Sequence, residues 1–488
     1  MLRLKQYILL LFLPLAIISC QEDILSDDPT LRLTFSHDSL LFDTVFTKMG
    51  SSTKRMMVYN PHNNAILINR VEMANGQSFF INLDGENQLE NLRDITLRGG
   101  DSLFLFVRAE IDPQKTNSPL VEDTITFYVS NQPQHIFLQA YGQNVEIIRS
   151  EEKFVQCNHL NLKNTKPYLI YDTLVVVGNL TIQRGTTLYM HSGSVIYAYG
   201  NVIAEGTKEE PIIIRGDRTD MLFDSVPYRV ASGQWNGLYL IHPKGWATPR
   251  YSINHTDILS GSIGLYALSE EMEQRPTMSL TNARIHNHSV YGLVLQNIDA
   301  TVVNCEISNC ASYCVYLSGG KHTFVHNTIA SYFGFPYTTI NIHNNILAED
   351  VAALYINNLS KNMAPTAASF HNCIITGARK NNVVVATPLT NHYEGTFSGN
   401  YLRADSLPEA FARNNIYASD SDNVVFRNIY YLYREYHYYD FRLDSLSPAR
   451  GVADSIISLS YPYDRIGTRR KTHPDAGCYE YIEEATPN

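Results

Sequence analysis

The sequence predicts an all-β protein with two parts: a sandwich of two sheets, followed by a parallel solenoid of short coils. Residues 31–147 alternate apolar and polar side chains between turn residues, as half-buried strands do. From residue 167 onward, short apolar strands are separated by glycines, without the long helical periods that β-α-β crossovers need. A His/Asn-x-x-Ile pattern then recurs at intervals of about 17 to 28 residues.

The first thirty residues predict the location of the protein. Arg3 and Lys5 precede an apolar run over residues 7–18, the order of a secretory signal and too short to span a bilayer comfortably. The run ends in Ser19-Cys20, which resembles the lipobox of bacterial lipoproteins. That resemblance implies removal of residues 1–20 and acylation of Cys20; an ordinary signal peptide is the alternative. Residues 21–30 read as a polar tether.

The acidic start of this tether, Gln21-Glu22-Asp23, resembles the surface-export signal of Bacteroidetes lipoproteins. We therefore expect a protein that is lipid-anchored to the bacterial outer membrane and exposed at the cell surface, with the periplasmic face as the alternative.

Residues 31–147 are expected to form a sandwich, and 148–166 a linker. Strand-like stretches such as "DSLFLFVRAEIDP" and "HIFLQAYG" alternate between turns at Asn60-Pro61, Asn75-Gly76 and Gly99-Gly100. The segment resembles immunoglobulin-like modules, which serve mostly as spacers and interaction units. It has no cluster of titratable groups suited to chemistry.

Residues 167–425 are expected to form the solenoid. The His/Asn-x-x-Ile pattern begins at the residues given below, and most repeats continue into a second apolar strand such as "GLYAL", "YCVYLS" or "ALYIN". The stretch resembles the right-handed, single-stranded parallel β-helices of Bacteroidetes surface lipoproteins. The column of first residues is His255, Asn282, Asn304, His326, His343 and His371.

This alignment explains three clustered cysteines, Cys305, Cys310 and Cys314. They occupy different parts of one coil, whereas a zinc site usually has paired ligands at a knuckle. We expect them to fill the interior as small apolar residues.

The same column raises the question of a metal site. Coils about 4.8 Å apart would make His326, His343 and His371 vertical neighbours, and three imidazoles can bind a transition metal. A ladder of stacked polar side chains is the alternative. The alternation of His with Asn favours the ladder, because Asn is a poor ligand for transition metals. We therefore expect no metal or other cofactor.

Residues 426–488 are expected to cap the solenoid, since its open end would expose strand edges and apolar core. The tyrosines between Tyr430 and Tyr439 are expected to cover that end. The segment resembles the closing part of pectate-lyase-like β-helices, although Arg450 and Gly451 depart from the family pattern. The matching residues are Arg442-Leu443, Ser447-Pro448-Ala449 and Asp475-Ala476-Gly477-Cys478-Tyr479-Glu480.

Three classes of function remain open, and binding or scaffolding of extended glycans is the one we favour. Charged residues make up only 18% of the chain and the net charge is −10, so we expect no nucleic-acid partner. The partners expected are a polysaccharide and, through the anchor, the outer membrane. Trp235 and Trp246 could stack on sugar rings, or could pack in the core and in a loop.

The second class is a polysaccharide lyase or glycoside hydrolase. Asp257, Arg284 and Glu306 share a column and could form an acid–base set, or a solvated charge ladder. The sparse acids elsewhere favour binding over catalysis. The third class is an adhesin or structural envelope protein, for which Arg215-Gly216-Asp217 spells an attachment tripeptide at a strand end.

Overall fold

The computed structural model describes residues 25–26, 28–112, 118–223, 226–333, 352–359, 363–386, 394–405, 407–419, 425–429 and 439–483, without the side chains of 222–226. The chain divides into two compact units, Met1–Asn144 and Val145–Asn488. Cys20, the rest of the expected signal peptide and most of the expected tether lie outside the described residues. Within the described residues, no helix is long and apolar enough to cross a membrane.

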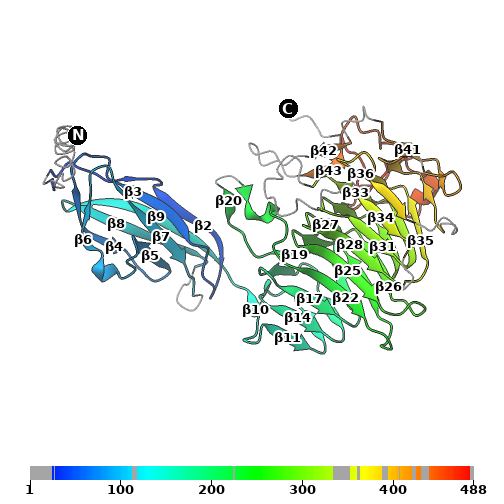
Figure 1. Cartoon of the computed structure of the whole chain (residues 1–488), viewed down its shortest axis with the longest axis horizontal. Helices are drawn as coiled ribbons and strands as arrows, with labels where there is room; N and C mark the ends of the chain where they lie inside the picture. Colours follow the sequence, from blue (N-terminus) through cyan, green and yellow to red (C-terminus); the bar gives the residue numbers. More distant parts are fainter. Residues whose placement is uncertain are drawn as a thin grey trace, which may run out of the picture. The chain divides into compact units, whose positions relative to one another are not determined.

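The first unit is a two-sheet sandwich (Figure 1). Its strands bury alternate side chains, as in β7, where Leu103, Leu105 and Val107 point into the shared core. The four-stranded sheet contains β1 (Thr34–Phe35), β3 (Lys54–Tyr59), β7 (Ser102–Ala109) and β5 (Phe79–Leu83). The five-stranded sheet contains β2 (Ser39–Phe46), β9 (Gln132–Gln143), β8 (Leu120–Val129), β4 (Ile66–Met73) and β6 (Arg93–Leu97). A short 3-10 helix, η1, spans Leu89–Asn91.

The second unit is a parallel β-helix, in which each full coil adds one strand to each of three sheets (Figure 1). The eleven-stranded sheet contains β10 (Glu146–Ile148), β13 (Tyr168–Ile170), β16 (Thr187–Met190), β19 (Ile212–Gly216), β24 (Thr256–Leu259), β27 (Arg284–His286), β30 (Glu306–Ser308), β33 (Thr328–Ser331), β36 (Ile374–Gly377), β39 (Tyr401–Leu402) and β41 (Ile416–Tyr417). The nine-stranded sheet contains β11 (Phe154–Cys157), β14 (Thr173–Val176), β17 (Val195–Ala198), β22 (Gly237–His242), β25 (Ile263–Ser269), β28 (Tyr291–Gln296), β31 (Val315–Ser318), β34 (Leu354–Asn357) and β37 (Val383–Ala386).

The ten-stranded sheet completes the coils. It contains β12 (Leu160–Leu162), β15 (Leu180–Ile182), β18 (Val202–Glu205), β23 (Arg250–Asn254), β26 (Thr277–Thr281), β29 (Asp299–Val303), β32 (Gly320–Val325), β35 (Thr366–His371), β38 (Phe397–Ser398) and β40 (Ala412–Arg413). An excursion after β19 forms β20 (Met221–Phe223), β21 (Val226–Pro227) and the 3-10 helix η2 (Tyr228–Val230). The inward side chains form one continuous core along the described coils, and the all-β fold expected from the sequence is confirmed.

The expected linker over residues 148–166 is wrong, because these residues form most of the first coil. β10, β11 and β12 pair in parallel with β13, β14 and β15. The apolar pattern that marks strands is weak over residues 148–166, because only one side of this coil is covered by a neighbouring coil. Its outward positions are therefore polar or exposed, as at Phe154, Gln156 and Asn161.

Between the ten- and eleven-stranded sheets, each turn from β23 to β36 hinges on one residue with positive φ. The column is His255, Asn282, Asn304, His326 and Asn372, with φ between 39° and 56°. Asn adopts this left-handed conformation more readily than most residues. His371 is therefore not in the column: it pairs with Val325 on the preceding strand, one residue before Asn372. His343 lies outside the described residues.

The C-terminal residues do more than close the end of the solenoid. After β42 (Phe426–Asn428) and β43 (Asp440–Leu443), residues 454–483 run back along the outer face of the eleven-stranded sheet, beginning with the short helix α2 (Ser455–Ser458). We call them the C-terminal strap. A separate apolar core lies between this sheet and the C-terminal residues, and it includes Ile374, Tyr401, Phe441 and Cys478. The expected end cap is therefore largely a side cover, because that face carries apolar side chains that need shielding.

Candidate functional site

The outer face of the nine-stranded sheet carries a column of tyrosines, one per coil over most of its length. Parallel pairing places Tyr197, Tyr239 and Tyr266 in register, then Val294, then Tyr316 and Tyr355. Neighbouring rings lie 5.1 Å apart between Tyr197 and Tyr239, and 5.4 Å between Tyr239 and Tyr266. Tyr316 and Tyr355 stack at 5.6 Å with an interplanar angle of 1°. We call this surface the tyrosine face.

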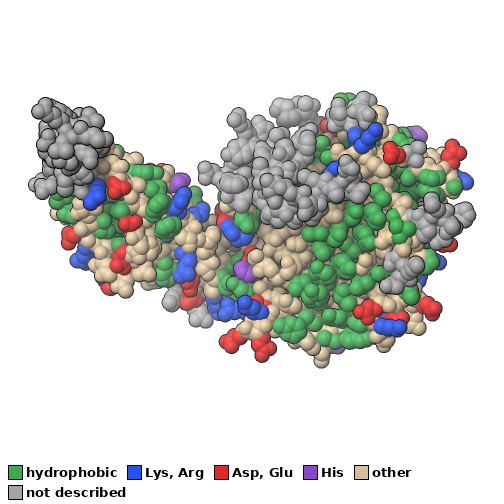
Figure 2. Space-filling view, viewed as in Figure 1, with side chains coloured by type: hydrophobic (Ala, Val, Ile, Leu, Met, Phe, Trp, Pro, Cys, Tyr) green, Lys and Arg blue, Asp and Glu red, His purple; other side chains and the backbone are tan. Residues whose placement is uncertain are grey.

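The tyrosine face is uncharged and accessible. From β14 to β37, no strand of this sheet contains Asp, Glu, Lys or Arg. All five tyrosines of the column are half-buried. Figure 2 shows hydrophobic side chains gathered over these strands. The surface therefore offers an apolar strip whose polar atoms include phenol hydroxyls.

Amide side chains border one side of the strip. The Tyr266 hydroxyl donates to Gln296 Oε1 at 2.5 Å, and Asn357 Nδ2 donates to the Tyr316 hydroxyl at 2.9 Å. Burial, with the neighbouring tyrosines, raises the pKa of Tyr239 and Tyr266. The phenols therefore remain protonated at neutral pH and can act as both hydrogen-bond donors and acceptors.

The two tryptophans differ in their surroundings. Trp246 is 47% exposed, and its ring lies 5.8 Å from that of Tyr199, at the edge of the tyrosine face. Trp235 is fully buried, and its indole N–H donates to the Leu259 carbonyl at 2.9 Å. A direct contact between Trp235 and a ligand is therefore excluded, whereas Trp246 keeps a free surface.

Asp257, Arg284 and Glu306 do lie in one column, on the outer face of the eleven-stranded sheet. We call this surface the charged face. Arg284 Nε lies 3.0 Å from Glu306 Oε1, and the Ser308 hydroxyl donates to the same oxygen at 2.8 Å. The alternative of a solvated ladder is wrong for Glu306, which is only 2% exposed.

The C-terminal strap supplies the remaining partners of these charges. The Tyr479 hydroxyl donates to Glu306 Oε2 at 2.5 Å, and Arg465 pairs with Asp257 at 2.5 Å. Burial alone would raise the pKa of Glu306, but the charges of Arg284 and Arg465, with the Tyr479 hydrogen bond, outweigh it and lower this pKa to about 2. The Glu306 carboxylate thus accepts hydrogen bonds from Arg284, Ser308 and Tyr479, and it is covered. This arrangement fastens the strap and leaves Glu306 almost no surface that a substrate could reach.

His286 extends the network without opening it. Its Nδ1 lies 2.8 Å from the Ser308 hydroxyl, and its ring meets Tyr439 and Phe441 edge-on at 5.8 and 6.0 Å. Burial, then the Arg284 charge, lower its pKa well below the usual value. A neutral imidazole next to Arg284 avoids adding a second buried positive charge.

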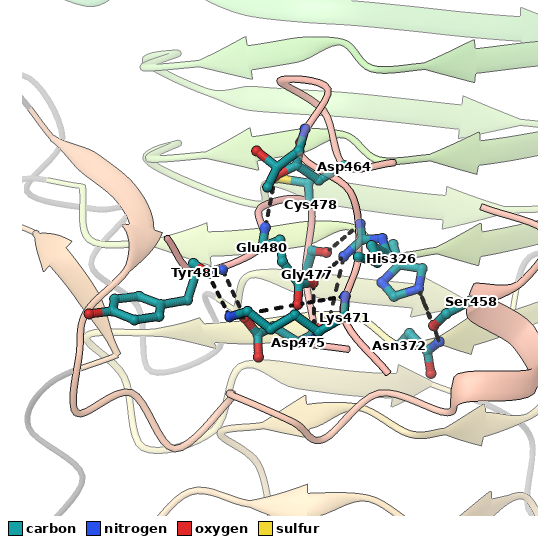
Figure 3. Close-up of polar contacts among 12 residues, drawn as sticks. His326, Asn372, Ser458, Asp464, Lys471, Asp475, Gly477, Cys478, Glu480 and Tyr481 are labelled. Atoms are coloured by element: carbon teal, nitrogen blue, oxygen red, sulfur yellow. Dashed lines mark hydrogen bonds and ion pairs between the residues drawn. The ribbon is translucent and has the colours of Figure 1, made fainter. Parts of the chain in front are cut away.

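Figure 3 shows how the strap is held where it starts and where it turns. His326 Nε2 lies 2.8 Å from the Ser458 hydroxyl and 3.1 Å from Asn372 Nδ2. Further along, the Glu480 backbone N–H donates to Asp464 at 2.9 Å. The described residues contain no group of three metal-ligating side chains, and His326 serves as a hydrogen-bonding turn residue.

The three clustered cysteines are buried, as expected, and belong to the core. Cys305, Cys310 and Cys314 are all free thiols. Burial raises the pKa of Cys305 to about 12, so this sulfur is uncharged at neutral pH. They behave as small packing residues.

The Arg215-Gly216-Asp217 tripeptide is held in the sheet. Asp217 lies 2.6 Å from His191 Nδ1, and the His191 ring stacks on Tyr171 at 3.9 Å. The Arg215 guanidinium donates to the carbonyls of Gly216 and Arg218. Both charged side chains thus have intramolecular partners, which weakens the case for this tripeptide as a protruding attachment site.

A small cavity of about 270 Å³ lies between the left-handed turns and the strap. Lys208, His255, Asn282, Tyr461 and Asp464 are among its lining residues. The Asp464 carboxylate accepts backbone N–H groups of Ile466, Thr468 and Glu480, so the strap folds around it. The cavity is a consequence of how the strap crosses the turns.

Comparisons with known proteins add no function. No protein-family model matches the sequence, and no curated protein matches it. A protein of unknown function from Porphyromonas gingivalis W83 is 12% identical over 25% of this chain and 50% of its own, with a TM-score of 0.19. A family 123 glycoside hydrolase from Clostridium perfringens, described for glycolipid glycan hydrolysis, is 6% identical over 24% of this chain and 30% of its own, also at 0.19. The match spans half or less of each structure, and TM-scores this low carry no argument.

Proposed function

We propose that this protein is a lipid-anchored lipoprotein of the outer cell surface of a Bacteroidetes-like bacterium, and that its β-helix binds extended glycans. The anchor rests on the lipobox-like Ser19-Cys20 and the acidic tether that follows it. The sandwich would then act as a spacer between the lipid and the β-helix.

The observation that supports glycan binding is the tyrosine face. Aromatic rings present large apolar area with a hydroxyl at one end, which suits sugars, whose surfaces combine C–H patches with hydroxyl groups. Five tyrosines in one column, Tyr197, Tyr239, Tyr266, Tyr316 and Tyr355, offer repeated contacts to a repeating ligand. Trp246 would add a contact at the edge.

Lyase or hydrolase activity remains the second reading, and the charged face supports it poorly. A hydrolase needs two carboxyl groups that reach the substrate, and a lyase needs an accessible base. Glu306 is covered and ionised, and Asp257 is paired with Arg465. Binding therefore fits the geometry better than catalysis.

The test uses soluble protein from residue 21 onward, incubated with plant, host and bacterial polysaccharides. Both retained protein and shortened chains are measured in each tube. We expect retention without shortening, and a loss of retention of about tenfold in Tyr239→Ala, corresponding to roughly 1.4 kcal/mol. Tyr239→Phe is the matched control for packing. Shortened chains would contradict the proposal and favour an enzyme.

A further inference from the structure

The tyrosine face also constrains the kind of glycan. Resting on the proposed function, we infer that the ligand is an uncharged polysaccharide that lies across the strands, parallel to the axis of the coils. Three observations carry this inference: the charge of the face, its repeat and the position of its polar groups.

The first observation is the absence of charge. None of the eight successive strands from β14 to β37 contains a Lys or Arg, so the tyrosine column has no cation within its own strands to pair with a carboxylate or sulfate; the nearest in sequence, such as Lys244, lie in the flanking turns. An acidic sugar pressed against Tyr197, Tyr239 and Tyr266 would lose hydration without gaining a counter-charge. A neutral sugar loses only hydroxyl hydration, which phenol and amide groups can replace.

The second observation is the repeat of the face. The column from Tyr197 to Tyr355 crosses six coils, from β17 to β34, and five of them place a tyrosine at the same position, with Val294 in the sixth. At about 4.8 Å per coil, it extends roughly 24 Å. A chain of several sugar residues along this line would meet equivalent side chains at regular steps. A chain parallel to one strand would meet a single tyrosine of the column.

The third observation is that the polar groups line one side of the column. Gln296 and Asn357 are the C-terminal residues of β28 and β34, and each is hydrogen-bonded to a tyrosine hydroxyl of the column. They present amide groups beside the aromatic strip, where ring hydroxyls of a bound chain would project. Amides recognise hydroxyl groups without selecting for charge.

The experiment compares two probes with the same backbone: a soluble neutral β-glucan and the same β-glucan carrying carboxymethyl groups. Polygalacturonate serves as a third, anionic probe. We expect the neutral chain to bind at least about tenfold more tightly than its carboxymethylated form. We also expect its affinity to be the same at low and high salt, since no ion pairs form.

A charge-introducing variant sharpens the test. Tyr239→Lys places one cation in the middle of the face, and it should weaken the neutral chain about tenfold while improving the carboxymethylated chain. Tyr239→Phe is the control for the loss of the hydroxyl alone. Circular dichroism and a thermal melt confirm that each variant is folded.

The outcomes separate the inference from the function it rests on. Tighter, salt-sensitive binding of the anionic probes to the wild type would overturn the inference and leave glycan binding intact. Binding of no glycan at all would overturn the proposed function. Neutral binding unaffected by Tyr239→Lys would place the ligand elsewhere and overturn the inference. Self-association that buries the face, detected by light scattering and lost in Tyr239→Lys, would also overturn it.

Discussion

Two outer faces of the same β-helix differ in their charge and in whether other residues cover them. The strands of the tyrosine face carry no Asp, Glu, Lys or Arg, five of six successive coils place a tyrosine in its column, and its rings are half-buried rather than covered. The charged face carries Asp257, Arg284 and Glu306 in register, and the C-terminal strap covers it. The residues that would attract attention as catalytic groups are those that hold the molecule together. The tyrosine face, by contrast, has no Asp, Glu, Lys or Arg on its strands from β14 to β37.

The charged face offers the largest expected effect. Glu306→Gln removes the charge that faces Arg284 and Tyr479, and it leaves the half-buried Arg284 guanidinium without its partner. We expect a loss of about 3–5 kcal/mol in the free energy of unfolding, measured by denaturant titration. Glu210→Gln is the matched control: Glu210 pairs with Arg184 on the surface and should cost no more than about 1 kcal/mol.

Thiol labelling shows whether the loss is local to the strap. Cys478 belongs to the strap and is buried in the core between the strap and the eleven-stranded sheet, whereas Cys310 and Cys314 lie inside the coils. In Glu306→Gln we expect faster labelling of Cys478 with Cys310 and Cys314 still protected. Equal labelling of all three would mean that the whole helix opens, and the strap would then not be a separate unit. Cys157, which is half-buried, provides the reference for an accessible thiol.

Acid should lower the free energy of unfolding of the β-helix. Burial lowers the pKa of His288 from 6.5 to about 4, so the unfolded chain takes up a proton between these values and the folded chain does not. Stability from this group is therefore lost as the pH falls from 6.5 toward 4, by at most about 3 kcal/mol. Glu306, with its pKa lowered to about 2, adds a further loss from about pH 4.5 downward.

Urea titrations at a series of pH values measure this dependence. Asp464 and Glu480 act in the opposite sense: burial raises their pKa values, so they reduce this loss of stability as the pH falls through the pKa values that they have in the folded state. An NMR titration of the His288 ring tests the assignment directly. A midpoint near the ordinary 6.5 would contradict a buried, neutral imidazole.

Much of this fold follows from local sequence. The strands of the β-helix repeat with a recognisable His/Asn column at one turn, and the clustered cysteines fill the interior of the coils. His371 was misplaced because Ile374 and Ile375 are adjacent, so "HNCI" and "NCII" both fit the repeat, and only strand pairing selects Asn372. The first coil was missed because its outward positions are polar.

The candidate site was harder to predict. The tyrosines stand at the centre of strands such as "GLYAL" and "YCVYLS", which the sequence already indicated, so their shared outward position could have been recognised. The strap could not: Tyr479 contacts Glu306 across 173 residues, and a contact between such distant segments leaves no periodic trace. Without it, Glu306 appears solvated and free to react.

The smallest effect is expected at the edge of the tyrosine face. Trp246 is exposed and contacts Tyr199, so Trp246→Ala should leave the melting temperature unchanged and weaken glycan binding about two- to threefold, corresponding to roughly 0.5 kcal/mol. Binding assays with Trp246→Phe as control measure this. If Trp246→Ala binds as tightly as the wild type, this tryptophan is only structural.

The most direct test of the account sets the two faces against each other in one assay. Wild type, Tyr239→Ala and Glu306→Gln are incubated with an immobilised neutral β-glucan at a temperature where all three proteins are folded. The amount of protein retained and the length of the glucan chains are both measured. The account predicts that Tyr239→Ala loses retention, that Glu306→Gln keeps it, and that no chain is shortened. Shortening by the wild type that disappears in Glu306→Gln, with retention unchanged in Tyr239→Ala, would contradict it.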